Sequence, residues 1–370
     1  MTQAQAQERI KKLRKEINRH RYLYHVLDRQ EISDSALDSL KHELTALETQ
    51  FPLLITPDSP TQRVAGKPLP GFKKVRHATP LRSLNDVFAE DELTQWSERV
   101  HKFANQFGSP KNLEYFAEIK VDGFAISLEY VDGILKTGST RGDGMTGEEV
   151  TENLKTLDSI PLRLHSPHEF LKEREMQKIL HTHPHIEKVI HTIPRHLEVR
   201  GEVYMTKHAL EKINHEQKKQ GLPLFANPRN IAAGSVRQLD SHITATRMLE
   251  FLAYDVLTDL GQQTHEESHI IARLFGFKTM ELARPCDSLK DITRFWQHVL
   301  TMRESLPLLI DGIVIQINSI DLFKKLGVAG KAPRGAIAFK FPAIEATTMI
   351  KKIIIQVGRT GVLTPGALLD

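Results

Sequence analysis

The chain has 370 residues, 40% hydrophobic and 26% charged, which is the composition of a globular protein of two or three domains. Its apolar runs fall short of the roughly 20 residues that a membrane span needs, and its polar N-terminus lacks the apolar core of a signal peptide. A single cysteine, Cys286, excludes an internal disulfide or thiolate zinc site and favours a reducing, cytoplasmic setting, while the net charge of +4 permits a nucleic-acid partner without requiring one.

The first 50 residues predict two helices. Ile10, Leu13 and Ile17 keep helical spacing in the first. Ser33 is placed to cap the second, in which Leu37, Leu40, Leu44 and Leu47 form an apolar stripe. Three prolines end this pattern, and the segment 60–72 resembles a linker.

Strands become frequent from about Phe72 onward. We predict them at 113–121, 124–130, 134–140, 196–205, 248–257, 310–317 and 335–341, with a further alternating pattern from about 346. Helical stretches lie between them, at 90–107, 147–157, 206–220 and 288–303. This mixture predicts an α+β fold with antiparallel sheets.

A histidine-rich segment spans about residues 164–196. Its histidines are His165, His168, His181, His183, His185, His191 and His196. Histidine tracts can bind metals, but no spacing here matches a known ligand motif. We therefore favour a solvated insertion between two strands over a specific metal site, and we assign no metal ligands from the sequence.

The stretch "EYFAEIKVDGFAISLEY", residues 114–130, places Glu118, Lys120 and Asp122 at alternate positions of a predicted strand, so that all three point to one face. A solvated strand edge would explain this pattern. The other interpretation is a nucleophilic lysine in a pocket, where Gly123 lets a bulky ligand approach the backbone. The flanking carboxylates favour the ammonium form, so on this interpretation they must contact something other than the lysine.

The block that runs from Glu118 to Leu157, "EIKVDGFAISLEYVDGILKTGSTRGDGMTGEEVTENLKTL", closely resembles the nucleotidyl-transfer motifs of the bacterial NAD-dependent DNA ligases. "YLYHVLDRQEISDSALDSL" is similar to their N-terminal NAD-specific domain. "LEVRGEVYM", "FANPRNIAAGSVRQLD", "IDGIVIQIN", "APRGAIAFKFPA" and "QVGRTGVLTP" follow in the family's order. Several separate motifs in register are far harder to obtain by chance than one.

The resemblance implies a function for each matched position. Lys120 would attack the α-phosphate of NAD, become lysyl-AMP and release nicotinamide mononucleotide. Glu118, Asp122, Gly123, Ser83 and Leu84 would line the adenylate pocket. The other implied nucleotide contacts are Arg141, Glu202 on the ribose side, Tyr254 stacked on adenine, Asp311, and Lys340 at the phosphates. Tyr24, His25, Asp34 and Asp38 would hold the nicotinamide mononucleotide half, and Arg229, Arg237 and Arg303 would serve the nucleotide or nicked DNA.

The resemblance further implies a helical domain over 1–70, a nucleotidyltransferase (ATP-grasp-like) adenylation domain over 71–343, and the incomplete start of an OB-fold over 344–370. It implies Mg²⁺ and nicked double-stranded DNA as cofactor and partner, no membrane, and a monomer. The family continues through an OB-fold, a four-cysteine zinc finger, a helix-hairpin-helix domain and a BRCT domain, and we expect the 370 residues to stop before these.

The sequence departs from the family pattern in several positions. Gln316 stands where the family has a lysine, and a neutral amide supplies no cation to the adenylate phosphate. Leu37 replaces a tyrosine and Gly335 a tryptophan, while Asp255 and the "LND" order after Ser83 are smaller changes.

Three functions therefore remain open. The first is an NAD-dependent DNA ligase that acts in replication and repair. The second is a fragment that adenylates itself without sealing nicks. The third is a protein that binds nucleotide or DNA without catalysis.

Overall fold

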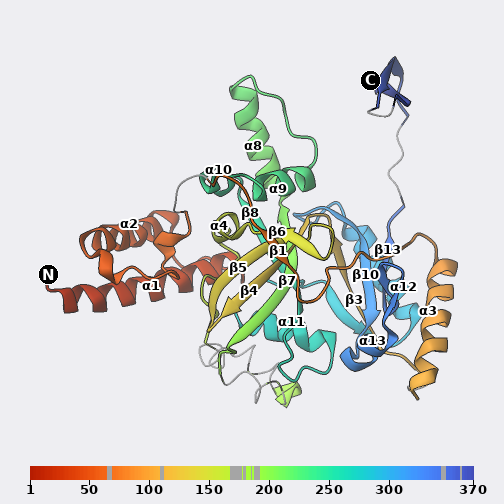
Figure 1. Cartoon of the computed structure of the whole chain (residues 1–370), viewed down its shortest axis with the longest axis horizontal. Coiled ribbons are helices and arrows are strands. Elements are labelled where there is room, and N and C mark those ends of the chain that lie inside the picture. The colour runs from red at the N-terminus through yellow and green to blue at the C-terminus, as the bar shows by residue number, and fades with distance from the viewer. Residues whose placement is uncertain are drawn as a thin grey trace. The chain divides into compact units, whose positions relative to one another are not determined.

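The computed structural model describes residues 1–64, 69–108, 112–166, 177, 181–184, 186, 192–342, 347–358 and 361–370 (Figure 1). The chain divides into two compact units, Met1–Lys340 and Phe341–Asp370. None of the described helices has both the length and the apolar composition needed to cross a membrane.

Two helices open the first unit and pack side by side (Figure 1), α1 (Gln3–His25) and α2 (Asp34–Gln50). The Ser33 hydroxyl accepts a hydrogen bond from the Ala36 amide, so the predicted N-cap is confirmed. The predicted stripe is also confirmed, because Leu44 and Leu47 are buried against α1 and Leu37 and Leu40 pack at the edge of the same core. Short 3₁₀ turns follow at Pro52–Leu54 and Pro60–Gln62.

A four-stranded antiparallel sheet has the order β5-β4-β7-β8. Its strands are β4 (Phe124–Val131), β5 (Ile134–Thr140), β7 (His196–Met205) and β8 (Leu249–Val256). Around it lie α4 (Thr151–Lys155), α8 (Lys207–Lys219), α9 (Pro228–Val236), α10 (Ser241–Ala245) and α11 (His265–Leu274). Helix α11 contacts β8 and α9 contacts β7, which covers the apolar side chains of the largest core.

A five-stranded sheet has the order β2-β13-β10-β3-β9. Its strands are β2 (Asp86–Val87), β3 (Tyr115–Val121), β9 (Ala283–Cys286), β10 (Ile310–Ile317) and β13 (Ala336–Lys340). The helices beside it are α3 (Glu90–Ala104), which a 3₁₀ turn extends over Asn105–Phe107, α12 (Leu289–Met302) and α13 (Ile320–Leu326). All pairings are antiparallel except that of β2 with β13.

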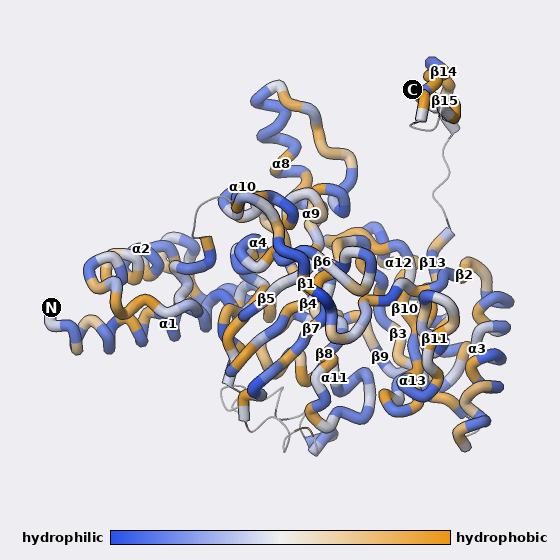
Figure 2. Tube along the Cα trace, viewed as in Figure 1, coloured by the Kyte–Doolittle hydropathy of each residue, from blue (hydrophilic) through white to orange (hydrophobic). Residues whose placement is uncertain are grey.

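Two short strand pairs complete the first unit. They join β1 (Lys74–Arg76) to β6 (Thr146–Glu148), and β11 (Val328–Ala329) to β12 (Ala332–Pro333). The second unit is an antiparallel hairpin of β14 (Ile350–Val357) and β15 (Leu363–Leu369). Figure 2 shows hydrophobic positions in this hairpin, and their side chains are exposed.

The predicted α+β class is confirmed, and each predicted strand matches an observed one to within two residues of its bounds, apart from the last, which begins at Ile350. The helix predicted over 147–157 is shorter, because Thr146–Glu148 pairs with β1 instead. Helices α9, α10, α11 and α13 lie in segments for which we predicted no element.

The histidine-rich segment is only partly described. His168, His185 and His191 lie outside the described residues. His165 is not a solvated side chain: its ring contacts Tyr22 edge-on at 4.6 Å, and burial lowers its pKa to about 4. His183 lies 3.6 Å from Glu267 of α11. His165, at the start of the segment, is thus partly buried rather than fully solvated.

Candidate active site

Strand register places Lys120 of β3 and Lys340 of β13 on either side of β10 at the same level of the sheet. Gly312 of β10 lies opposite both lysines, so the three residues form one row across the sheet. A Cβ on Gly312 would lie 2.3 Å from the Phe339 carbonyl oxygen, which explains the glycine between two long side chains.

A β-bulge in β10 re-aims Asp311 toward this row. The register shifts between Ile310 and Gly312, and Asp311 then lies beside both lysines. Its Oδ1 is 3.4 Å from Lys120 Nζ, and its Oδ2 is 3.2 Å from Lys340 Nζ. Lys340 also lies 3.5 Å from Asp86 of β2. Burial lowers the pKa of Lys340, but the carboxylates of Asp311 and Asp86 outweigh it and leave the pKa raised.

Glu202 of β7 lies across the turn between β3 and β4. A Cβ on Gly123 would lie 2.4 Å from the Val203 carbonyl oxygen and 2.7 Å from Glu202 Cγ, so only glycine lets β7 approach this closely. Burial raises the pKa of Glu202 to about 7, although the charges of Lys120, Arg229 and Arg141 act to lower it. Such a shift, together with specific charge partners, is typical of functional carboxylates.

Basic side chains surround a polar pocket of about 820 Å³ between β4, β5, β6 and α9. Its lining residues are Lys74, Gly123, Phe124, Ala125, Thr140, Arg141, Gly142, Asp143, Thr146, Gly147, Glu148, Glu202, Arg229 and Arg237. Arg229 pairs with Asp122 at 2.9 Å, and Arg237 with Glu148 at 2.7 Å. Arg141 donates to the Ser83 hydroxyl at 2.6 Å. This volume suits a nucleotide-sized ligand, and the arginines suit its phosphates.

Tyr254 of β8 lies near Glu202 and other charged side chains of this region. Burial raises the pKa of its phenol, and the carboxylates of Glu202, Asp255 and Glu118 raise it further. The side chain is therefore a neutral, partly buried aromatic ring between acidic groups, which is suitable for stacking on a base.

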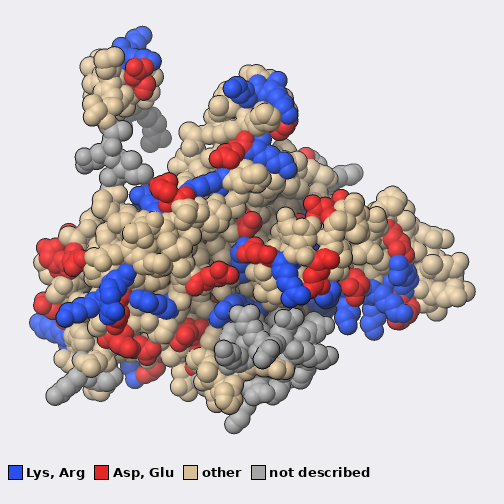
Figure 3. Space-filling model, turned by 180° about the vertical axis from the view of Figure 1, so that it is seen from behind, with Lys and Arg blue, Asp and Glu red and all other residues tan. Residues whose placement is uncertain are grey.

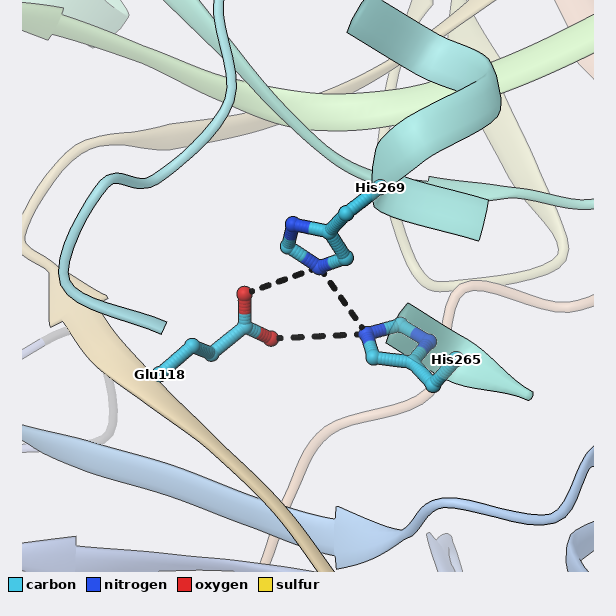
Figure 4. A group of neighbouring side chains, drawn as sticks. All are labelled: Glu118, His265 and His269. Atoms are coloured by element: carbon cyan, nitrogen blue, oxygen red, sulfur yellow. Dashed lines mark hydrogen bonds and ion pairs between the residues drawn. The ribbon is translucent and has the colours of Figure 1, made fainter. Parts of the chain in front are cut away.

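Glu118 points toward His265 and His269 of α11 (Figure 4). Its carboxylate lies 3.7 Å from His265 Nε2 through Oε1 and 3.3 Å from His269 Nε2 through Oε2, and all three side chains are buried. Burial raises the pKa of Glu118, but the two imidazoles outweigh it and lower the pKa to about 2. The requirement that the carboxylates beside Lys120 contact other groups is met here and by the Asp122–Arg229 pair.

The N-terminal candidates lie around the α1–α2 connection. The Tyr24 ring is 4.8 Å from that of His25, and His25 Nε2 is 3.5 Å from Asp158, which follows α4. Asp34 accepts a hydrogen bond from Gln30, and Asp38 pairs with Lys41.

Two other candidates, and two of the departures from the family pattern, lie on loops or in the sheet. Leu84 is half-buried beside exposed Ser83, and Arg303 follows the last residue of α12. Gln316 lies opposite Phe116 of β3, four pairs along the register from Lys120. Phe323 and Leu326 occupy the space beside Gly335, where a Cβ would lie 2.9 Å from the Phe323 ring.

Sequence reasoning missed Asp86, His265 and His269. The two histidines carried a signal, since "HEESH" places them one helical turn apart, but α11 was not predicted. Asp86 carried no such signal in the sequence, because only the parallel pairing of β2 with β13 brings it to Lys340.

On the face shown in Figure 3, basic and acidic side chains are interspersed.

Comparison with known proteins gives a consistent result. A family model described as the NAD-dependent DNA ligase adenylation domain matches residues 69–178 and 174–344, and the DNA ligase-like N-terminal NAD⁺-binding domain matches 3–65. A DNA ligase of Solibacter usitatus is 43% identical over 97% of this chain and 50% of its own length, and one of Geotalea daltonii is 44% identical over 100% and 52%. The chain thus spans about half the length of these relatives.

The ATP-dependent DNA ligase of bacteriophage T7, solved in complex with ATP, covers 73% of this chain and 77% of its own at 12% identity. Its TM-score of 0.31 is too low to support an argument about the fold.

Proposed function

Because the chain belongs to the NAD-dependent DNA ligase family, we propose that it adenylates itself on Lys120 with NAD as the AMP donor. The observation that carries the proposal is that Asp311 lies beside both Lys120 and Lys340, next to half-buried Glu202 and the polar pocket. A solvated strand edge would not bring two lysines to one carboxylate and place a perturbed carboxyl beside them.

In the proposed reaction Lys120 Nζ gives up a proton to solvent water and attacks the α-phosphorus of NAD. The new N–P bond forms as the P–O bond to the nicotinamide mononucleotide phosphate breaks, and that phosphate leaves with the electron pair. Lys340 and Arg141 would offset the charge on the phosphate oxygens. Glu202 would contact the ribose, Tyr254 would stack on adenine, and Tyr24, His25, Asp34 and Asp38 would hold the nicotinamide mononucleotide half.

Magnesium fits this site as a weakly held ion. Asp86 and Asp311, which both lie beside Lys340, offer hard oxygen donors, and Asp311 Oδ1 is buried without a hydrogen-bond partner among the described residues. Mg²⁺ keeps several waters and binds mainly through substrate phosphates, so few protein ligands are needed. When bound, it would neutralise charge on the phosphates.

The later steps extend the same proposal to DNA. AMP would pass to the 5′-phosphate of a nick in double-stranded DNA, and the 3′-hydroxyl would displace it, as replication and repair require. Arg229, Arg237 and Arg303 would contact the nucleotide or the DNA, so binding would weaken as salt rises. We propose that the chain acts as a monomer in the cytoplasm, in keeping with its lone cysteine.

Intact-mass measurement tests the first step. Incubation with NAD and Mg²⁺ should add the mass of one AMP to the protein, and Lys120→Ala should abolish the gain. Lys120 is one-quarter exposed, so its truncation should leave the fold intact. No gain at any NAD concentration would refute the proposal.

A nicked duplex with a pre-adenylated 5′ end tests the last step separately. Sealing supports the complete ligase function, whereas self-adenylation without sealing supports the fragment interpretation. Gln316→Lys should raise the rate of AMP addition if the absent cation limits it, and an unchanged rate would show that Gln316 is not limiting.

Asp311→Asn tests the bridging carboxylate. Because Asp311 holds both lysines, its loss should slow single-turnover AMP addition by roughly 10- to 100-fold, as misplaced reacting groups do. Asp321→Asn is the matched control, since Asp321 is an exposed residue of α13 that pairs with Lys325. Equal rates for the two variants would refute a positioning function for Asp311.

A further inference from the structure

Two histidines of α11 and one glutamate of β3 point into a common centre (Figure 4). His265 and His269 are one helical turn apart, so their rings lie on the same face of α11. Glu118 faces them from β3, and Phe116 on the same strand packs against both rings, with centroids 5.2 and 5.0 Å away. One potential ligand atom from each of the three residues lies within 4.8 Å of the others.

The separations match those of metal ligands. His265 Nε2 lies 3.2 Å from His269 Nε2, which lies 3.3 Å from Glu118 Oε2, and the other Glu118 oxygen lies 3.7 Å from His265 Nε2. Tetrahedral ligands held about 2.0–2.1 Å from zinc lie roughly 3.3 Å from one another. The three side chains thus need little movement to bind an ion of this size.

The polar atoms of the cluster are incompletely satisfied without an ion. Glu118 Oε2 and His269 Nδ1 are buried and have no hydrogen-bond partner among the described residues. A contact between two Nε2 atoms also uses one ring as donor and the other as acceptor. A cation at the centre would give both Nε2 atoms and the carboxylate a common partner.

The surroundings hold the ligands in place. Asp255 Oδ1 lies 3.8 Å from His265 Nδ1, where a carboxylate can orient a metal-bound imidazole. The Thr264–Glu267 capping box begins α11, and buried Asn318 accepts from the His265 amide through its carbonyl and from the Glu266 amide through its side chain.

We propose that Glu118, His265 and His269 form a binding site for one divalent transition-metal ion, most suitably Zn²⁺. Two imidazoles and one carboxylate leave a fourth tetrahedral position for water, and soft-to-borderline ions prefer this donor set over Mg²⁺. The site lies on the strand that carries Lys120, two residues earlier, and an ion there would hold the Glu118 carboxylate on α11. The proposal does not depend on the adenylation reaction.

Cobalt(II) alone is the probe, added to the chelator-treated full chain. Tetrahedral Co²⁺ with imidazole ligands absorbs strongly in the visible, so wild type should titrate with one such site, and Zn²⁺ should displace it. His269→Leu replaces the ligand with an apolar side chain suited to the buried position and should weaken this binding by more than about tenfold. Mutating residues that only hydrogen-bond to metal ligands already weakens metal binding by about 10- to 100-fold, so removing a ligand should weaken it at least as much. His298→Ala, an exposed histidine of α12, should leave it unchanged.

The histidine-rich segment is present in every variant, so its background binding cancels from the comparison. Glu118→Gln provides a second variant, which keeps the side-chain shape and should also weaken binding, in case His269→Leu does not fold. The absence of a tetrahedral Co²⁺ spectrum in wild type would refute the site and leave a hydrogen-bonded cluster. A spectrum that both variants retain would likewise refute it, because the ion would then lie elsewhere.

Discussion

At the scale of single residues, the site depends on where charges are buried. Asp311 lies between two lysines at once, whereas half-buried Glu202 lies near cations that only partly offset its desolvation. One carboxyl group thus pairs directly with cations, while the other has its pKa raised to about 7. The sequence alone could not predict this difference, because it depends on the distance between β3, β7 and β10.

Glu202 should make stability depend on pH. Its pKa is about 7 in the folded chain against 4.5 for the ordinary carboxyl, so the folded state binds more protons between these values. Stability should therefore fall as pH rises from about 4.5 to about 7, by up to about 3 kcal/mol. Urea unfolding at several pH values measures this change.

Glu202→Gln should flatten the decline, since an amide does not titrate. Other groups titrate equally in both proteins, so the difference between the two curves isolates Glu202. Parallel curves would show that Glu202 is not the group responsible.

At the scale of elements, the geometry of the site depends on two glycines at which neighbouring strands come close together. Gly123 lets β7 lie against the β3–β4 turn, and Gly312 lets β13 and β3 present their lysines across β10. The strands themselves were predictable from alternation, since β3, β4, β7 and β10 match their predicted ranges closely. Helix α11 was not predicted, although it supplies both histidines and begins at a Thr264–Glu267 capping box, which is a local signal in the sequence.

Gly123→Ala should destabilise the chain by about 1–3 kcal/mol, because the added methyl would collide with a backbone carbonyl. Gly234→Ala is the matched control: it lies inside α9, and a Cβ there meets nothing within 4 Å. That change should stabilise by about 0.5–1 kcal/mol. Denaturant unfolding of both variants gives the comparison, and a neutral Gly123→Ala would mean that β7 can move aside.

At the scale of the whole first unit, the N-terminal helices are joined to the sheets by buried charge. The Arg63 guanidinium donates to the carbonyl oxygens of Lys155, Leu157 and Ile160 at 2.8–3.0 Å. Asp158, between them, pairs with Arg21 of α1 at 3.0 Å. These contacts make residues 1–64 part of the same compact unit as the sheets.

Arg63→Met should destabilise this unit by about 2–4 kcal/mol, because three buried carbonyl oxygens and Asp158 lose a cationic partner. Arg9→Met is the control, since Arg9 pairs with Glu43 on the surface and should cost at most about 1 kcal/mol. Thermal or urea unfolding distinguishes them. Equal losses of unfolding free energy in the two variants would show that the buried contacts of Arg63 stabilise the unit no more than a surface ion pair does.

The sequence by itself determined the α+β class, the capped helix α2, the principal strands and the family, because alternation, capping residues and motif order are local properties of the chain. It also identified Lys120, whose importance rests on motifs in register. Only the tertiary structure decided which charges meet: Asp311 reaches two lysines through a bulge, Asp86 arrives by a parallel pairing, and Glu118 faces two histidines more than 140 positions away in the chain. Such contacts depend on strand register and helix packing, which no local pattern encodes.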